Sequence, residues 1–505
     1  MESGLLFPVL CVYFVLLFVL GWMGYRRRVE ASPDDFYLAG KKLGVVVLFA
    51  TLYATQYSGN TFLGYTGQAY RIGFAWVMSV GMMMSIVFLY LLFAPVLHRE
   101  AHRHGFLTPG DWIEHRFGDR RLRWLASAIM AFSLLNYLYA QFLAMGHIAV
   151  SLSGGTVPFW AGVLVLAVVI GFYETLGGMR SVAWTDVLQG AMLLVGLGAV
   201  LLLVWSKVES LESVTRPLVE EGSPLVAVPS WETCATWVSS VALLGLGGCV
   251  YPQAIQRIYA ARDPSALRRA LRVMVWMPLA TTFVVFLVGL LAHGILPGRS
   301  GIAADRVMPE LLYALSREGT LASLGSALVL VGALAAIMST ADSALLTLSS
   351  ILAWDFYGVR REKKTSAETA ALGKWFSWGI IAFLFLLAVR PPTTLWRLIE
   401  IKMELLMQVA PIVIFGARSP HLSAKAALVA LGTGTSLALG GFLGGVDRLG
   451  GFHTGSLACA GNALLCYAAI ARARRRRGVS RPSREDVREQ TNDRTGRGSP
   501  SRARA

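Results

Sequence analysis

The side chains best placed to do chemistry in this 505-residue sequence are acids inside long apolar segments. Asp186 lies about one helical turn into such a segment, directly after the glycine-rich, basic stretch 177–182. A carboxylate at the centre of a membrane costs about 2.5–3.5 kcal/mol on insertion scales, and less near the ends of a span. Such a side chain normally faces a partner or a water-filled pathway. Asp186 is therefore a candidate for binding or releasing a cation.

A second acid, Asp342, lies within a group of hydroxyl residues. Ser339, Thr340 and Ser343 have the spacing that lets them share one face of a helix. Oxygen atoms are the ligands that hard cations prefer. Serine and threonine hydroxyls also commonly bond the carbonyl one turn back. The presence of Asp342 favours a cation site, because a second carboxylate in the membrane needs a partner.

Two apolar segments are interrupted by polar residues or glycines, at 54–61 and 245–253. Irregular backbone at membrane depth persists only where protein or a water-lined cavity satisfies its polar groups. Helix packing through glycine is the simpler explanation for each interruption alone. The paired interruptions instead predict a solute site between them, lined by Gln56, Ser58, Thr61, Tyr139, Cys249, Tyr251 and Gln253.

No charged side chain is expected in this pocket. Glu400, Lys402 and Glu404 alternate in sign where the eleventh apolar segment begins. This pattern is typical of a solvated helix start, with contact to a solute as the alternative.

The composition indicates what must position these residues. Hydrophobic residues make up 55% of the chain, the mean hydropathy is +0.57, and 15% of residues are charged, against about a quarter in soluble domains. Recurrent long apolar stretches predict an all-α integral membrane protein with about thirteen transmembrane helices. The expected spans are 5–25, 44–70, 76–97, 124–152, 158–176, 183–206, 234–256, 273–296, 320–352, 375–390, 403–417, 426–441 and 454–471.

The placement of basic residues predicts the orientation of these spans. When the spans alternate, 36 of the 46 Lys and Arg residues fall on one side. The positive-inside rule then places the N-terminus outside and the C-terminus in the cytoplasm of a multi-pass cell-membrane protein. Residues 1–471 form the membrane domain. Residues 472–505 are expected to be a disordered, basic cytoplasmic tail that contacts anionic lipid rather than nucleic acid.

The two interruptions lie five spans apart, in helices that run in opposite directions. This is the relation expected of the first helices of two inverted five-helix repeats. The repeats would cover about residues 44–206 and 234–441.

Three motifs together resemble those of the sodium:solute symporter family. They are WTDVLQ at 184–189, QRIYAARDPSALRRA at 256–270 and MSTADSALLTLSS at 338–350, and the resemblance covers roughly residues 5–470. The family includes bacterial proline, pantothenate and sugar symporters. The resemblance implies the leucine-transporter fold and alternating access driven by the sodium gradient.

The resemblance also implies ligands for the coupling ion. Sodium would be bound by the carbonyls of Ala54, Tyr57 and Ala336 and by the hydroxyls of Ser339 and Thr340. Some members hold a further cation, at positions that match Asp186, Ser339, Asp342 and Ser343.

Two positions differ from proline-type members: the first implies that a sodium-linked role of those members is absent or moved, and the second argues against proline as the solute. Gln56 stands where those members carry an aspartate, and Leu246 stands where they carry an aromatic residue. The stretch 391–453 looks somewhat like pantothenate symporters instead.

The function predicted from the sequence is sodium-coupled symport of a small organic solute, without an organic cofactor. A proton-coupled symporter of the same fold is the main alternative. A symporter-like solute sensor and a passive channel are further ones. The sequence shows neither a nucleophile–base pair nor a metal-ligand cluster, which argues against an enzyme. It specifies neither the solute nor the oligomeric state.

Overall fold

In a computed structural model, the protein is built almost entirely of helices. The structure describes residues 3–26, 32–152, 155–296, 302–358, 366–389 and 395–479. The elements before residue 206 are α1 (Ser3–Arg26), α2 (Pro33–Leu38), η1 (Ala39–Lys41), α3 (Val45–Gln56), η2 (Thr61–Tyr65), α4 (Thr66–Ile72), η3 (Gly73–Val77), α5 (Met78–His104), α6 (Pro109–Phe117), α7 (Arg120–Leu152) and α8 (Phe159–Trp205).

The second half is also helical, apart from one short hairpin. Its elements are α9 (Leu211–Glu220), α10 (Trp231–Cys249), α11 (Pro252–Ala260), α12 (Pro264–Met274), α13 (Met277–Ala280), α14 (Thr282–Leu291), η4 (Ala292–Gly294), α15 (Ala304–Ser316), α16 (Thr320–Ser350), η5 (Ile351–Tyr357), α17 (Ser366–Ala388), α18 (Leu395–Leu406), α19 (Val409–Arg418), α20 (Ala424–Leu443), β1 (Arg448–Leu449), β2 (Phe452–His453) and α21 (Thr454–Val479).

The all-α class expected from the sequence is confirmed. Among the described residues, nine helices are long and apolar enough to cross a membrane, and the bent pair α10–α11 would make a tenth. Among the described residues, α3 and the first part of α8 (residues 159–172) are apolar but shorter than this length. The count of thirteen spans and the division into two repeats remain predictions.

The first predicted interruption is present. Helix α3 ends at Gln56, and Tyr57 has extended backbone angles (φ −104°, ψ 114°) before the chain resumes as η2. Gly59 lies in this break, where an added Cβ would be 2.2 Å from Cγ1 of Ile337. A residue without a side chain therefore lets the broken segment approach α16 closely.

The second predicted interruption is also present. Helices α10 and α11 meet at an angle of 48°. Pro252 is the first residue of α11, a position where its missing N–H costs no helical hydrogen bond. Both α3 and α10 therefore end inside the protein.

Three boundaries differ from those expected. The predicted loop 177–182 is instead a kink inside the long helix α8, at Gly178 (φ 56°, ψ −151°). The predicted eleventh span 403–417 starts earlier and is broken between α18 and α19. Helix α21 continues to Val479, past the predicted end at residue 471. The rest of the predicted tail lies outside the described residues.

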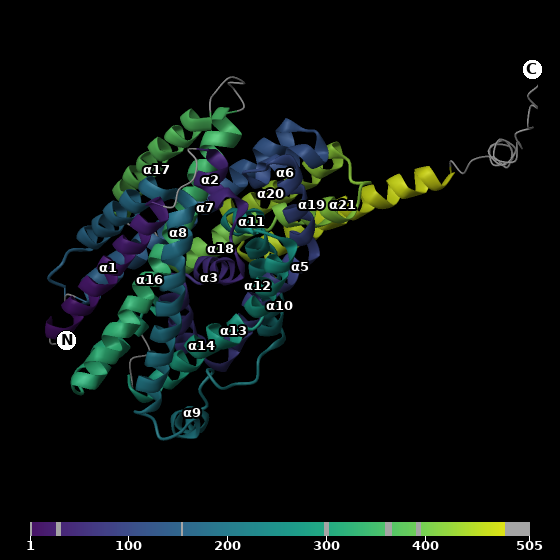
Figure 1. The fold of residues 1–505 in the computed structure, drawn as a ribbon. Helices are drawn as coiled ribbons and strands as arrows, with labels where there is room; N and C mark the ends of the chain where they lie inside the picture. The colour runs from purple at the N-terminus through teal and green to yellow at the C-terminus, as the bar shows by residue number, and fades with distance from the viewer. Residues whose placement is uncertain are drawn as a thin grey trace, which may run out of the picture.

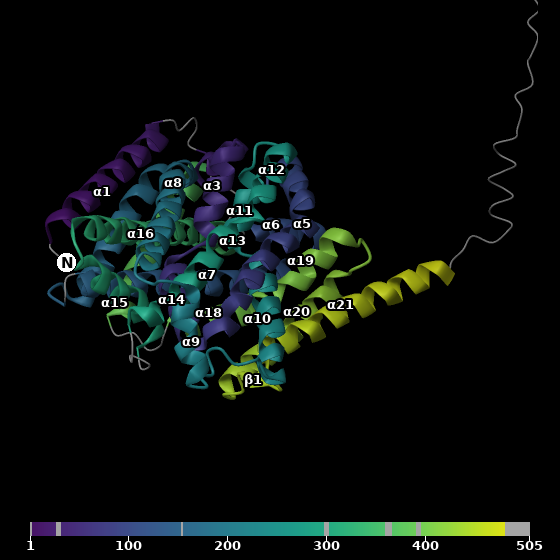
Figure 2. The same ribbon diagram turned by 90° about the horizontal axis from the view of Figure 1, so that it is seen from below.

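The helices pack around a centre that contains both breaks. Helices α1, α8 and α16 lie side by side along one flank, and α3, α11 and α18 lie near the middle (Figures 1 and 2). Helix α21 projects from the opposite side of the molecule.

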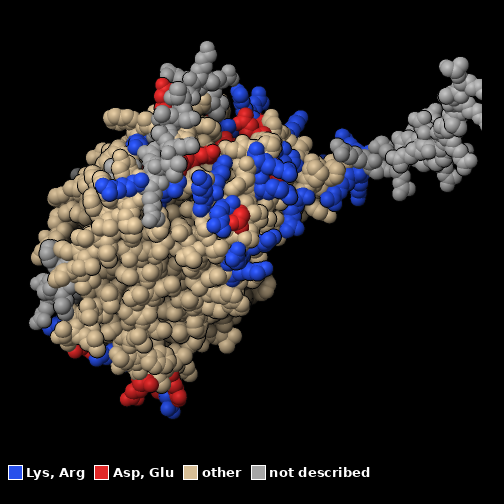
Figure 3. Space-filling view, viewed as in Figure 1, with Lys and Arg blue, Asp and Glu red and all other residues tan. Residues whose placement is uncertain are grey.

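Charge is divided between the two ends of the molecule. A broad tan band separates an end rich in Lys and Arg, called here the basic end, from an end where acidic residues gather (Figure 3). The acidic end includes α9 and its flanks, with exposed Glu209, Glu212, Glu220 and Glu221.

Candidate functional site

The break after α3 frees a carbonyl that then faces α16. In an unbroken helix the N–H of Ser58 would bond the carbonyl of Ala54, but it donates to Thr61 Oγ1 at 3.2 Å. The carbonyl of Ala54 instead accepts from Ser339 Oγ at 3.0 Å. Ser339 Oγ also lies 3.2 Å from the carbonyl of Ala336. Three of the five predicted sodium ligands therefore meet at one place, where Ser339 Oγ contacts the carbonyl oxygens of Ala54 and Ala336.

The other two predicted ligands border this group. The hydroxyl of Thr340 is fully buried beside Tyr137, and it forms no hydrogen bond of normal geometry within the described residues. Tyr57 is the extended residue that ends α3, so its carbonyl lies outside regular helix. We name these five residues, Ala54, Tyr57, Ala336, Ser339 and Thr340, the sodium cluster.

Asp186 lies beside a basic residue that the sequence interpretation missed. Its Oδ2 accepts a hydrogen bond from Thr51 and lies 3.3 Å from Nη2 of Arg257. Both charged side chains are fully buried. The guanidinium also donates to Ser343 Oγ, and its Nε donates to Thr51 Oγ1 at 2.8 Å.

The predicted grouping of Asp186, Ser339, Asp342 and Ser343 is therefore divided. Ser339 contacts the break in α3, whereas Ser343 contacts Arg257 and lies 3.3 Å from Oδ1 of Asp342. The sequence interpretation counted Arg257 among the charges of a loop. The restart of the helix at Pro252 instead places it inside the protein. A buried acid that requires a partner was the signal that could have found it.

A small cavity lies between the two breaks. The centre of a water molecule can occupy a volume of about 30 Å³ in it. This is enough for water but not for an organic solute. Four of the predicted solute-binding residues line it: Gln56, Ser58, Thr61 and Tyr251. We call it the midplane cavity.

The other three predicted residues have different contacts. The hydroxyl of Tyr139 donates to the carbonyl of Leu387 at 3.4 Å, because it lies on a different face of α7 from Tyr137, which does line the cavity. Cys249 Sγ contacts the carbonyl of Leu246 in its own helix at 3.3 Å. Gln253 is fully buried one turn before Arg257, and its carbonyl accepts from that guanidinium.

A charged side chain does line the midplane cavity, contrary to expectation. Lys402 is buried, and its Nζ lies 3.1 Å from the ring centroid of Tyr137 and 5.2 Å from that of Tyr251. The two rings stack, with centroids 5.4 Å apart and planes at 3°. The predicted solvated helix start was wrong for Lys402, because α18 begins at Leu395 and carries this residue inward.

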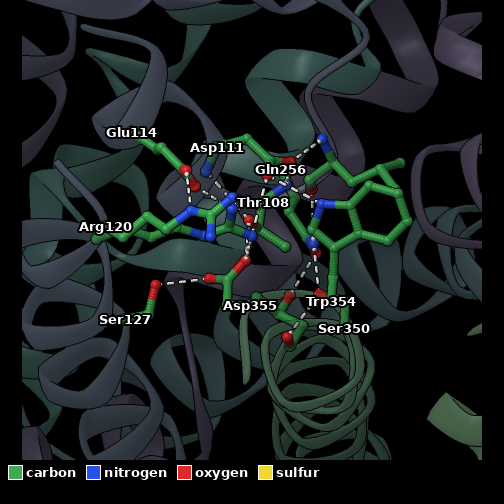
Figure 4. Close-up of polar contacts among 12 residues, drawn as sticks. Thr108, Asp111, Glu114, Arg120, Ser127, Gln256, Ser350, Trp354 and Asp355 are labelled. Carbon is green, nitrogen blue, oxygen red and sulfur yellow. Dashed lines mark hydrogen bonds and ion pairs between the residues drawn. The ribbon is translucent and has the colours of Figure 1, made fainter. Parts of the chain in front are cut away.

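A second polar group, called here the Asp355 cluster, contacts the start of α6 (Figure 4), and α6 lies at the basic end (Figures 1 and 3). The carboxylate of Asp355 accepts from Thr108 Oγ1 at 2.6 Å, from Ser127 Oγ at 2.6 Å and from Arg123 Nη2 at 2.8 Å. Arg123 also pairs with Asp111 and Glu114. The cluster therefore connects α6, α7 and η5.

Neighbouring bonds extend this connection to α11 and α16. Gln256 Nε2 donates to the carbonyl of Leu107 at 3.1 Å and to Ser350 Oγ at 2.7 Å. Gln256 Oε1 accepts from Thr347 at 2.7 Å. The side chain of Gln256 thus ties the broken helix pair α10–α11 to the same end of the molecule.

One group of possible metal ligands also appears, which spacing in the sequence did not reveal. Glu100, His104 and His115 place ligand atoms within 4.8 Å of one another. His104 Nε2 lies 3.5 Å from Glu100 Oε2, and its ring lies 4.0 Å from that of His115. These two contacts hold the three side chains together.

Solved structures show the class of fold. A Na⁺-coupled sialic acid symporter, in a substrate-bound outward-open state, superposes with a TM-score of 0.77 at 16% identity, covering 92% of this chain and 97% of that one. MhsT in complex with L-phenylalanine superposes with a TM-score of 0.55 at 13% identity, covering 85% and 97%. These neighbours have the leucine-transporter fold, so this all-helical protein has that fold.

Sequence comparison then identifies the family. The profile of the sodium:solute symporter family matches residues 36–434, and the chain belongs to that family. The sodium/pantothenate symporter of Escherichia coli strain K12 is 26% identical over 404 residues, which cover 78% of this chain and 80% of the relative. The sodium/proline symporter 2 of Staphylococcus saprophyticus is 26% identical over 370 residues, covering 71% and 70%. Sodium-coupled transport, rather than enzymatic activity, is the activity of this family.

Proposed function

We propose that the protein uses the sodium gradient to take up a small organic solute by alternating access. The carrying observation is the contact of Ser339 Oγ with the carbonyls of Ala54 and Ala336 across the break in α3. These oxygens belong to two separate helices. A sodium ion bound among them would hold the two helices together, with Tyr57 and Thr340 as further ligands.

This geometry supports a coupling mechanism. An ion that bridges α3 and α16 binds best in the conformation that keeps them close, so it shifts the population towards that conformation. If the same conformation binds the solute, each ligand increases the affinity for the other. The small volume of the midplane cavity agrees with a closed conformation, from which the protein must open to admit solute.

The proposed second coupling site comprises Asp186, Asp342 and Ser343, with Arg257 as a resident positive charge. The guanidinium already contacts Asp186 and Ser343. A cation that passed this point would have to displace it. The contacts of Arg257 with Asp186 and Ser343 would then change when sodium leaves the sodium cluster.

The proposed architecture has thirteen spans, of which ten form two inverted repeats. Its N-terminus lies outside and its C-terminus in the cytoplasm of the cell membrane. The concentration of Lys and Arg at one end of the molecule supports this orientation (Figure 3). The basic tail would contact anionic lipid on the cytoplasmic side.

The test is sodium-driven uptake into proteoliposomes by a Ser339→Ala/Thr340→Ala variant. We expect sodium-stimulated uptake and sodium-dependent thermal stabilisation to be lost, because two ligand hydroxyls are removed. Ser349→Ala is the matched control, since its hydroxyl donates to the carbonyl of Leu346 within the same helix and Ser349 is outside the sodium cluster. Unchanged sodium dependence in the double variant would contradict the ion assignment.

A second measurement separates the alternatives. Uptake driven by an imposed sodium gradient is compared with uptake driven by a pH gradient. A proton-coupled symporter would respond to the pH gradient, a passive channel to neither, and a sensor would show no flux at all.

A further inference from the structure

We infer that the midplane cavity binds solutes that carry a carboxylate and no ammonium group, with Lys402 as the positive partner of the carboxylate. The inference rests on the proposed function and names the class of solute for that site.

Lys402 differs from the other buried cations near the transport path. Arg257 lies against Asp186, and Arg123 lies against Asp355. Within the described part of the chain, no carboxylate oxygen lies within 4.0 Å of Lys402 Nζ, and none of its N–H groups donates a hydrogen bond. A buried charge requires a partner. Because this one borders the cavity, the partner can come from the solute.

The contacts that Lys402 does make stabilise its charged form. Its Nζ lies over the face of Tyr137, 3.1 Å from the ring centroid, and near Tyr251. The negative face of an aromatic ring attracts an ammonium group. A contact with the face of a ring is not a normal hydrogen bond. The N–H groups of Lys402 therefore stay available to donate to an anion.

The acids on the same helix do not cancel this charge in the cavity. Glu400 and Glu404 lie two positions from Lys402, and residues two apart on a helix do not share a face. Glu400 Oε1 lies 3.5 Å from Arg448 Nη2. Neither glutamate lines the cavity, whereas Lys402 does. The cavity wall therefore attracts anions and repels ammonium groups.

Two buried amides supply complementary hydrogen-bonding groups. Gln56 and Asn60 line the cavity, and Gln56 Nε2 and Asn60 Oδ1 have no hydrogen-bond partner within the described residues. Gln56 is 8% exposed and Asn60 is 5% exposed. Nε2 can donate to a carboxylate beside Lys402, and Oδ1 can accept from a hydroxyl or amide of the solute. The expected solute is thus a polar monocarboxylate.

The experiment is thermal unfolding of the full-length protein in detergent, in sodium chloride and in choline chloride. The probes are monocarboxylates, each paired with its neutral analogue: pantothenate with panthenol, nicotinate with nicotinamide, and propanoate with propanamide. Proline is the zwitterionic probe. We expect at least one carboxylate to stabilise the protein in sodium, with at least about tenfold higher affinity than its neutral analogue.

Variants of Lys402 connect this preference to the residue. Lys402→Met should lose the tenfold preference and keep the stabilisation by sodium alone, whereas Lys402→Arg should keep a preference for the carboxylate. Lys425→Met is the matched control, because Lys425 is an exposed lysine on α20. An unchanged preference in Lys402→Met would overturn the inference. Stabilisation by the neutral or zwitterionic probes alone would also overturn the inference. The same holds if none of the carboxylates stabilises the protein.

The outcome also separates this inference from the proposed function. Sodium-driven uptake of a neutral solute would overturn the inference and leave sodium coupling intact. Carboxylate binding that requires Lys402, without any effect of sodium, would support the inference and contradict sodium coupling.

Discussion

The midplane cavity and the Asp355 cluster both gather buried polar side chains from several helices, but they satisfy them differently. In the Asp355 cluster, Asp355 accepts three hydrogen bonds, and Arg123 pairs with three carboxylates. In the cavity, Lys402 Nζ lies over aromatic rings, and within the described residues Lys402 has no ion pair and Gln56 has an unpartnered amide nitrogen.

We propose that this difference separates polar groups that are satisfied within the protein from groups that a ligand can satisfy. Hydrogen bonds and ion pairs that are complete within the protein stabilise one arrangement of α6, α7 and η5. Groups without partners cost free energy when they are buried, and a bound solute can remove that cost. The comparison therefore predicts that the two regions respond in opposite ways to loss of charge.

The largest effect is expected from removing one charge in each region. Asp355→Ala leaves Arg123 without one of its buried partners, which should lower the free energy of unfolding by about 3–5 kcal/mol. Lys402→Met should change it little or raise it, because it removes a charge that has no ion pair. Chemical unfolding in detergent measures both. Equal losses in the two variants would contradict the comparison.

A double-mutant cycle tests whether the Asp186–Arg257 pair belongs with the satisfied groups. Asp186→Asn and Arg257→Met each leave one member of the pair alone, and the double variant removes both charges. We expect a coupling free energy of about 1–3 kcal/mol in unfolding measurements. Additive effects would show that the 3.3 Å contact contributes nothing.

Glycine substitutions compare the backbones of the two regions. In Gly59→Ala the new methyl group would meet Ile337, so the break could not approach α16 as closely, and the half-saturating sodium concentration should rise about tenfold. In Gly110→Ala it would meet Asp355 Oδ2 at 2.4 Å, which should lower stability without a specific change in sodium affinity. Gly198→Ala, with nothing within 4 Å, is the control for both.

The smallest effect is expected from pH. Burial and the charge of Asp355 raise the pKa of Asp111, which lies on α6 outside the spanning helices, to about 6. The folded state then binds more protons than the unfolded state between the ordinary pKa of about 4 and 6. The stability that this site contributes is present at low pH and lost as pH rises through 6. In thermal unfolding, Asp111→Asn should remove this dependence, and an identical pH profile in wild type and variant would contradict it.

Much of the sodium cluster could be predicted from local sequence. The interruption at 54–61 and the hydroxyl pair Ser339 and Thr340 are both visible in the sequence, and Ala54 and Ser339 do meet. Local patterns sufficed here because a helix break exposes carbonyls wherever it occurs, and hydroxyls that are neighbours in the sequence stay close together on one helix.

The lining of the midplane cavity was less predictable. Of the seven predicted residues, Gln56, Ser58, Thr61 and Tyr251 line the cavity, whereas Tyr139 faces another helix. The rotation of each helix about its axis decides such outcomes. An apolar span carries a weak amphipathic signal, so that rotation is hard to infer from one sequence.

The sequence by itself determined the helical membrane architecture, the two broken helices and the presence of costly acids within spans. Apolar length, glycine and proline act locally, so they can be read along the chain. Only the tertiary structure decided that Arg257 partners Asp186 and that Lys402 borders the cavity without an acid beside it among the described residues. The partner of a buried charge comes from a distant helix, and packing alone determines which helix that is.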